Sequence, residues 1–164
     1  MRWYGWLSMP LGIGICIVYA AAHLIGSPTP SIAAGWYWRH SGKPTVSKGQ
    51  LVLLEPSADV RTLIARIAPG YEALPWVKRI IGLDGDMVCY GERITVNGTD
   101  YGPRPLRETS VQVPVEEGCQ SIAGGHVLVL GTHPYSFDGR YVGPMPVTQL
   151  QANVSPVWTW ERHP

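Results

Sequence analysis

Apolar residues are concentrated in one uninterrupted run near the start of the chain. From Trp6 to Ile25 the sequence contains no Asp, Glu, Lys or Arg. An α-helix needs about 20 apolar residues to cross a hydrocarbon core of roughly 30 Å, and this run has that length. Aromatic residues flank the run on both sides, as is typical of helices that end at the two membrane interfaces. The pattern predicts a membrane anchor within residues 1–26 and a separate domain over residues 27–164.

A cleaved signal peptide is the alternative interpretation of the same run. Residues 20–22 are alanines and fit a small-residue cleavage site, and Arg2 would supply a short positive segment in front. Cations stand on both sides of the run, with Arg39, Lys43 and Lys48 after it. The distribution of positive charge therefore leaves the orientation across a membrane open. The uncleaved anchor is our working prediction.

Beyond the run, short apolar segments alternate with glycines, prolines and other turn residues, which is typical of an antiparallel β domain. One helix is expected over residues 60–68, with Asp59 as its N-cap and Gly70 behind its end. The predicted fold class is therefore mainly β, an antiparallel sheet domain with an N-terminal transmembrane helix. Strands are expected around Lys78 and over residues 50–55, 87–90, 93–96, 126–131 and 156–160, with a hairpin turn at Asn97 and Gly98.

A lysine interrupts one of these apolar strands. Lys78 lies in the sequence Trp76-Val-Lys-Arg-Ile-Ile81, in which β-branched residues flank it. Side chains alternate along a strand, so either Lys78 or its neighbour Arg79 must approach the core. Burial can lower the pKa of a lysine until the amine is neutral and basic, whereas arginine effectively never loses its proton. Lys78 is therefore the candidate for a buried base, and the alternative is a lysine that reaches solvent over an apolar stem.

Composition narrows the classes of protein. The chain of 164 residues is long enough for one domain with its own core. Hydrophobic residues make up 45% and charged residues 15% of the chain, a low charged fraction for a freely soluble protein. The formal net charge is +1 and no long basic run is present, which argues against nucleic acid as a partner.

The pattern of cysteines gives no indication of a metal-binding site. Cys16 falls inside the apolar run, where a packing role is expected. Cys89 and Cys119 each lie next to an expected strand and form either a disulfide in an oxidising compartment or two buried thiols. No C-x-x-C pattern and no histidine cluster accompanies them, so neither a zinc site nor another metal or cofactor site is expected.

Motifs of the common hydrolase classes are absent. The sequence has no G-x-S-x-G elbow, no H-E-x-x-H pattern and no Walker loop. The histidines are scattered, and none has an evident serine and carboxylate partner. A serine that uses a neutral lysine as its base is a recognised variant of the serine–histidine arrangement. Ser31, upstream of Lys78, is the candidate nucleophile for this chemistry.

Three blocks of sequence resemble the signal peptidase I family and occur in the family's order. The segment Thr29-Pro-Ser-Ile-Ala-Ala-Gly-Trp-Tyr37 is similar to its serine block, S-M-P-x-G-x-Y. Val77-Lys-Arg-Ile-Ile-Gly-Leu-Asp-Gly-Asp86 is similar to its lysine block, V-K-R-I-I-G-L-P-G-D. Ser136-Phe-Asp-Gly-Arg-Tyr-Val-Gly143 is similar to its S-x-D-S-R-Y-x-G block. Ile32-Ala33 stands where the family has Met-Pro, and Asp84 where it has Pro, so the resemblance leaves peptide specificity open.

The resemblance implies a role for each matching residue. Ser31 would be the nucleophile that forms an acyl-enzyme, and Lys78 would be the general base and then the general acid. The backbone N–H of Ser31 would hold the oxyanion with help from the hydroxyl of Thr29. Ser136 would hydrogen-bond the lysine.

The role of Asp138, the acidic residue of the third block, is less direct. Asp138 would orient the site, either through Lys78 or through Arg140. The alternative is an ion pair between Asp138 and Arg140 that only holds a loop.

Finer details resemble one branch of the family, the TraF-type peptidases of bacterial conjugation systems. Four positions carry this likeness: Cys89 after the lysine block, Gly118-Cys119, Asp138-Gly-Arg140, and Pro156-Val-Trp158. The branch implies a membrane-anchored serine endopeptidase that cleaves a precursor, with a conjugative prepilin as its substrate. It also implies a single-pass protein of the bacterial inner membrane, in contact with the lipid bilayer, with its catalytic domain in the periplasm.

Two other functions compete with this hypothesis. A general secretory signal peptidase would use the same chemistry on other precursors. A non-catalytic assembly factor of the secretion channel would keep the fold without the reaction. Retention of Ser31, Lys78 and Asp138 together disfavours the assembly factor, because a scaffold needs none of these groups.

Overall fold

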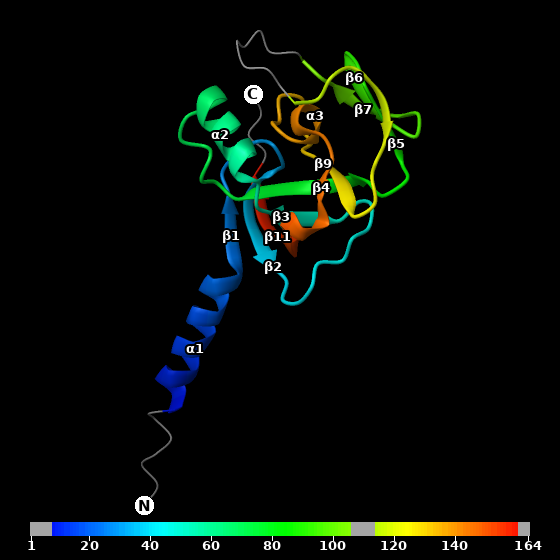
Figure 1. The fold of residues 1–164 in the computed structure, drawn as a ribbon. Helices are drawn as coiled ribbons and strands as arrows, with labels where there is room; N and C mark the ends of the chain where they lie inside the picture. The colour runs from blue at the N-terminus through cyan, green and yellow to red at the C-terminus, as the bar shows by residue number, and fades with distance from the viewer. Residues whose placement is uncertain (1–7, 106–113, 161–164) are drawn as a thin grey trace, which may run out of the picture.

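The computed structural model describes residues 8–105 and 114–160, and their secondary structure is mainly antiparallel β, as the sequence predicts (Figure 1). In chain order the elements are α1 (Ser8–His23), β1 (Leu24–Ser27), β2 (Ala34–Arg39), β3 (Leu51–Leu54), α2 (Ala58–Ile67), β4 (Trp76–Gly82), β5 (Met87–Tyr90), β6 (Arg93–Val96), β7 (Thr99–Pro103), β8 (Gly118–Ser121), β9 (His126–Leu130), α3 (Gly139–Val142), β10 (Met145–Pro146), a 3₁₀ turn (Val147–Gln149) and β11 (Leu150–Trp160).

The strands form two sheets. The larger sheet has the order β1-β2-β11-β3-β4-β9-β10, and the smaller has the order β7-β6-β5-β8. The last strand of the chain, β11, therefore lies between β2 and β3 and pairs antiparallel with both. Strand β4 lies between β3 and β9, so both of its edges are hydrogen-bonded. Figure 1 shows the smaller sheet at one end of the molecule and α1 projecting from the other end.

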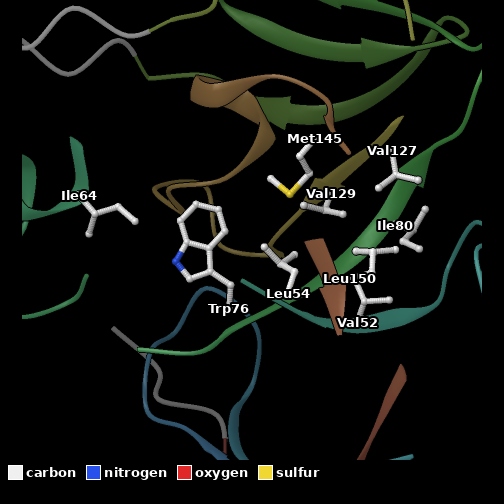
Figure 2. Packing of buried hydrophobic residues seen from close by; sticks show 9 residues of the cluster. All are labelled: Val52, Leu54, Ile64, Trp76, Ile80, Val127, Val129, Met145 and Leu150. Carbon is white, nitrogen blue, oxygen red and sulfur yellow. The ribbon is translucent and has the colours of Figure 1, made fainter. Parts of the chain in front are cut away.

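The core divides between the two faces of the larger sheet and the space under the smaller one. Alternation along β9 assigns its side chains to different clusters, since Val127 and Val129 point one way and Leu128 and Leu130 the other. The first cluster packs α2 against the larger sheet (Figure 2); it contains Val52, Leu54, Ile64, Trp76, Ile80, Val127, Val129, Met145 and Leu150. The second joins the two sheets and contains Val88, Tyr90, Ile94, Val96, Ile122, Leu128 and Leu130.

The sequence pattern predicts the start of α2 two residues too late. The helix begins at Ala58 instead of residue 60, and its N-cap is Ser57, whose hydroxyl accepts a hydrogen bond from the backbone N–H of Val60. The extended backbone of Ser57 is typical of an N-cap. Asp59 lies in the first turn, where the positive end of the helix dipole stabilises its carboxylate. The hairpin turn at Asn97 and Gly98 is confirmed, because both residues have positive φ, as a type I′ turn requires.

The predicted transmembrane helix is not found. Among the described residues, no helix is both long and apolar enough to cross a membrane. The described part of the apolar run is divided between two elements, because the chain leaves α1 after His23 and pairs as β1 with β2, with Leu24 opposite Trp38. Residues 1–7 of the predicted anchor lie outside the described residues.

A disulfide joins the strands at the edge of the smaller sheet. Cys89 of β5 and Cys119 of β8 are directly opposite in the ladder, and their sulfur atoms are bonded. Of the two possibilities that the sequence left open, the structure therefore contains the disulfide. The bond closes a loop with a sequence separation of 30 residues.

Removing this disulfide should lower the stability of the domain. Closing a loop of this length restricts the unfolded chain, and the chain-entropy relation gives about 3.5 kcal/mol for the effect. We expect the double variant Cys89→Ala/Cys119→Ala to lose free energy of unfolding of that order in urea denaturation. Cys16→Ala, which removes an exposed free thiol, is the control and should unfold like the wild type. Equal stability of all three proteins would contradict the prediction.

Candidate active site

The connection between β1 and β2 carries Ser31, and contacts on two sides hold it. The carbonyl oxygen of Ser31 accepts a hydrogen bond from the backbone N–H of Thr132, with an N···O distance of 2.7 Å. The next residue, Ile32, is buried and packs against Tyr37. The hydroxyl of Thr29 lies 3.0 Å from the hydroxyl of Ser31. The backbone of the candidate nucleophile is therefore fixed, while its half-buried side chain stays at the surface of a cleft.

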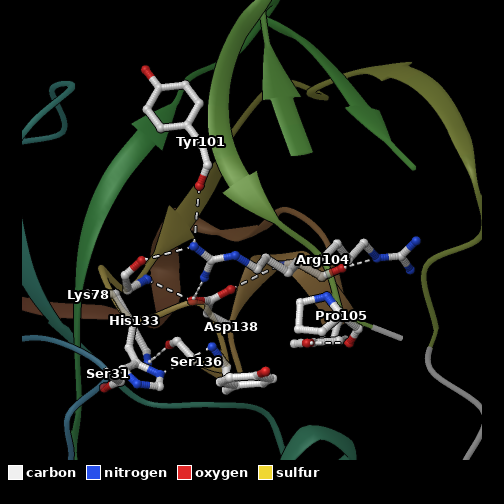
Figure 3. A network of polar contacts seen from close by, with 12 residues as sticks. Ser31, Lys78, Tyr101, Arg104, Pro105, His133, Ser136 and Asp138 are labelled. Carbon is white, nitrogen blue, oxygen red and sulfur yellow. Dashed lines mark hydrogen bonds and ion pairs between the residues drawn. The ribbon is translucent and has the colours of Figure 1, made fainter. Parts of the chain in front are cut away.

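Lys78 is buried in the middle of the larger sheet, as the strand pattern predicts. Its side chain belongs to the face that also carries Trp76 and Ile80, and the residue is only 3% exposed. The ammonium donates a hydrogen bond to the hydroxyl of Ser136 at 2.8 Å (Figure 3). It also lies 5.3 Å from the centre of the Trp76 ring, within the range of a cation–π contact.

Burial changes the acidity of this lysine. Loss of hydration disfavours the charged form and lowers the pKa of Lys78 from 10.5 to about 8. The carboxylate of Asp138 opposes this effect by attracting the ammonium, and the guanidinium of Arg140 adds to it by repulsion. Lys78 therefore carries a proton that it can release and regain near neutral pH.

Asp138 and Arg140 form a buried ion pair behind the lysine. Both residues are almost fully buried, and their closest charged atoms are 2.5 Å apart. Asp138 also accepts hydrogen bonds from the backbone N–H groups of Arg140, at 3.0 Å, and Gly131, at 2.7 Å. Arg140 in turn donates to the carbonyl of Gly131 at 3.1 Å. The ion pair that the sequence offered as an alternative role is therefore present, and it is fixed to the end of β9.

Gly131 allows the three segments of the site to approach one another. A Cβ atom on Gly131 would lie 2.2 Å from the carbonyl oxygen of Ser31 and 2.4 Å from the hydroxyl oxygen of Ser136. Both distances are far inside van der Waals contact. Any side chain at this position would push the serine loop or the Ser136 loop away.

A cleft of about 410 Å³ opens in front of these groups. Its polar end is lined by Thr29, Ser31, Lys78 and Ser136. Its apolar wall comes mainly from α2, the loop behind it, β4 and the loop after β9, with Ile64, Ile67, Leu74, Trp76 and Phe137. An extended peptide segment with an apolar side chain fits a cleft of this character. In residues 8–105 and 114–160, no group of three or more His, Cys, Asp or Glu side chains is placed to hold a metal ion.

Two residues near the site are not predicted by the sequence. His133 lines the cleft, and its ring nitrogen accepts a hydrogen bond from the backbone N–H of Tyr135 at 3.2 Å. Arg104 is 2% exposed and donates to the carbonyl of Arg140 at 2.7 Å, which supports the ion pair from behind. Arg104 stands between two prolines without an apolar pattern, so no sequence signal marks it as buried.

The structure thus brings most of the predicted site residues together. Thr29, Ser31, Lys78 and Ser136 line one cleft, and Asp138 and Arg140 lie directly behind it. The Cys89–Cys119 disulfide lies apart, in the smaller sheet. A serine hydroxyl and a desolvated lysine in one peptide-sized cleft fit a peptidase.

Comparison with known proteins agrees with that class. The family described as signal peptidase, peptidase S26, matches residues 4–160. The chain therefore belongs to the signal peptidase family S26.

The relatives place it with the TraF-type members. The chain is 30% identical over 174 residues to a plasmid transfer protein TraF of Escherichia coli, covering 92% of this chain and 93% of that protein. It is 27% identical over 148 residues to a conjugal transfer protein TraF of Agrobacterium fabrum, covering 81% of each. Among solved structures, a signal peptidase I of Enterococcus faecalis covers 70% of this chain and all of that chain, with 17% identity and a TM-score of 0.41.

Asp138→Asn should destabilise the protein because it leaves Arg140 buried without its counter-charge. Breaking one partner of a buried pair typically costs about 3–5 kcal/mol, and we expect a loss of that order in the free energy of unfolding. The matched control is Asp100→Asn, which breaks an exposed ion pair with Arg93 and should leave stability nearly unchanged. Urea denaturation of both variants tests this. A loss for Asp138→Asn no larger than for the control would contradict the buried pair's structural role.

Proposed function

We propose that this chain is a serine endopeptidase in which Ser31 is the nucleophile and Lys78 the general base, and that it cleaves the leader of an exported precursor. One observation carries the proposal. Lys78 is buried with a lowered pKa in the same cleft as Ser31, and a lysine needs both conditions to act as a base. A surface lysine would stay protonated at neutral pH.

The proposed reaction begins with attack by the Ser31 oxygen on the scissile carbonyl. Neutral Lys78 takes the hydroxyl proton as the new C–O bond forms, and the resulting ammonium gives that proton to the leaving amine as the C–N bond breaks. Water then attacks the acyl-enzyme in the same way and releases the carboxylic acid. The backbone N–H of Ser31 and the hydroxyl of Thr29, close to the attacking oxygen, would hold the oxyanion.

Ser136 and Asp138 would position the base rather than react. The hydroxyl of Ser136 accepts a hydrogen bond from the ammonium of Lys78, which fixes the long side chain in one direction. Asp138 attracts the same ammonium and thereby limits how far burial lowers the pKa. Without that attraction the base would be weaker at the moment it must accept a proton.

The substrate that we propose is a conjugative prepilin. The TraF relatives support this choice, because their names refer to plasmid transfer and conjugal transfer. We further propose that the protein works at the bacterial inner membrane with its cleft in the periplasm. The Cys89–Cys119 disulfide favours an oxidising compartment, and the apolar segment before Ser31 favours a membrane-proximal position.

Ser31→Ala and Lys78→Met should each abolish cleavage, because one removes the nucleophile and the other removes the base at nearly constant volume. We expect the rate on a membrane-embedded prepilin to fall by about 10³-fold or more in each variant. The measurement is the appearance of mature pilin after mixing full-length protein and precursor in vesicles.

Lys48→Met is the matched control for the lysine. Lys48 pairs with Asp86 at the surface, outside the cleft, so its loss should leave the cleavage rate unchanged. Continued cleavage by the Ser31 or Lys78 variant would refute the proposed pair. Equal cleavage of ordinary secretory precursors would instead assign the protein to general secretion.

The cleavage rate should rise with pH through the pKa of Lys78. Only the neutral amine can accept the serine proton, and the neutral fraction increases as the pH rises through about 8. We therefore expect kcat/KM to increase about tenfold per pH unit well below that value and to level off above it. The Lys48→Met control should give the same curve. A rate independent of pH between about 6 and 9 would exclude Lys78 as the base.

A further inference from the structure

His133 is a polar side chain of the cleft that the proposed reaction does not use. The polar residues that the reaction does use are Thr29, Ser31, Lys78 and Ser136. Two tyrosines, Tyr71 and Tyr135, also line the cleft, but they are 53% and 58% exposed. His133 is half-buried, so its ring is held more closely than theirs.

His133 is the first residue of a tight turn that contacts both sides of the site. The backbone N–H of Ser136 donates to the carbonyl of His133 at 3.0 Å and closes the turn. Pro134 occupies the second position, where its fixed φ is favoured. The backbone N–H of His133 donates in turn to the carbonyl of Ser31 at 3.4 Å (Figure 3). The backbone of His133 is therefore held between the proposed nucleophile and the serine that contacts Lys78.

One nitrogen of the His133 ring is occupied within the turn. The backbone N–H of Tyr135 donates to Nδ1 at 3.2 Å, and because an amide N–H can only donate, Nδ1 carries no hydrogen. The hydrogen of the neutral ring is therefore on Nε2, on the side of the ring away from the turn. Within residues 8–105 and 114–160 no group pairs with Nε2. The ring thus brings an unpaired N–H donor to the wall of the cleft.

The turn itself does not require a histidine. Tyr135 has no positive φ, so the turn is of type I rather than type II. Asp, Asn and Ser are preferred at the first position of such turns, because their short side chains can accept from the N–H two residues later. Nδ1 of His133 makes this same hydrogen bond. What histidine adds to an asparagine at this position is the Nε2–H.

We propose that the Nε2–H of His133 donates a hydrogen bond to a main-chain carbonyl of the bound precursor, close to the scissile bond. This inference deepens the proposed function and rests on it. An extended peptide offers a carbonyl acceptor at every residue, whatever its side chains. Because the backbone of His133 contacts that of Ser31, the carbonyl that it meets lies near the one that is attacked. His133 thereby helps to hold the peptide in the register that places the scissile carbonyl at Ser31.

Two substitutions separate the two nitrogens of the ring. His133→Asn keeps an acceptor for the turn at the position of Nδ1 and removes the donor at Nε2. His133→Gln keeps an N–H donor near the position of Nε2 and removes the acceptor of the turn. His126→Asn is the matched control, because His126 is also half-buried but lies on β9 outside the cleft. Each full-length variant is assayed with a vesicle-embedded precursor.

We expect His133→Asn to raise KM about five- to tenfold with kcat nearly unchanged, because a hydrogen bond present in both the ground state and the transition state is lost. Its pH profile and its unfolding in urea should match the wild type, because the turn and the contact between Ser136 and Lys78 are kept. His133→Gln should keep a KM near that of the wild type even though the turn loses its side-chain bond. His126→Asn should behave like the wild type in every assay.

Three results would overturn the proposal. The first is an unchanged KM in His133→Asn. The second is a shifted pH profile for that variant, which would mean that His133 acts through Ser136 and Lys78 instead of on the substrate. The third is a raised KM in His133→Gln but not in His133→Asn, which would limit the ring to its role in the turn.

Precursors with altered side chains beside the scissile bond test the kind of acceptor. A main-chain carbonyl is present in all of them, so the ratio of KM between His133→Asn and the wild type should be the same for each. A ratio near one for some of these precursors and not for others would assign the contact to a substrate side chain and contradict the proposal.

Binding to an inactive protein separates this inference from the proposed function. In a Ser31→Ala background, His133→Asn should weaken binding of a fluorescently labelled precursor about five- to tenfold. If the wild type does not cleave the precursor but binding depends on His133 in this way, the proposed function fails and the contact stands. If the wild type cleaves and binding does not depend on His133, the contact fails and the proposed function stands. Absence of both cleavage and binding would overturn both.

Discussion

Burial of the Lys78 ammonium is the constraint around which the rest of the site is arranged. Water no longer stabilises this charge, so the protein must supply other partners. The hydroxyl of Ser136 accepts a hydrogen bond from it, and the carboxylate of Asp138 attracts it. Asp138 is itself buried, and it needs Arg140 and the N–H of Gly131 to be stable there. One buried lysine thus accounts for a chain of buried polar groups that would otherwise each destabilise the domain.

The same network also positions Ser31, the proposed nucleophile, through the backbone rather than through side chains. Gly131 accepts from Arg140 and donates to Asp138, and the next residue, Thr132, donates to the carbonyl of Ser31. The end of β9 is therefore in contact with the serine loop and with the ion pair at once. Because Gly131 has no side chain, the two can be closer than any other residue would allow. The backbone of Gly131 and Thr132 therefore both stabilises the buried ion pair and positions Ser31.

Local patterns in the sequence predict the parts of the fold that are governed by local physics. Apolar residues around Lys78 predict its burial, and Asn97-Gly98 predicts the hairpin, because side-chain alternation and turn geometry involve only near neighbours. The end of α1 is not predictable in this way, since Leu24 leaves the helix only because β2 offers it a partner. Arg104 is a similar case, because its burial follows from the position of Arg140. The end of α1 and the burial of Arg104 therefore both depend on contacts between residues far apart in the sequence.

The central position of β11 in the larger sheet affects the order in which the domain can fold during synthesis. The serine loop is joined to β1 and β2, and Lys78 belongs to the β3–β4 pair, but β2 and β3 do not pair with each other. In the strand order of the described residues, β11 (residues 150–160) lies between them and pairs with both. A partly synthesised chain that lacks β11 already contains Ser31 and Lys78, but the two groups of strands that carry them are not yet joined in one sheet. The larger sheet, and with it the cleft that both side chains line, is therefore complete only after residues 150–160 have been added.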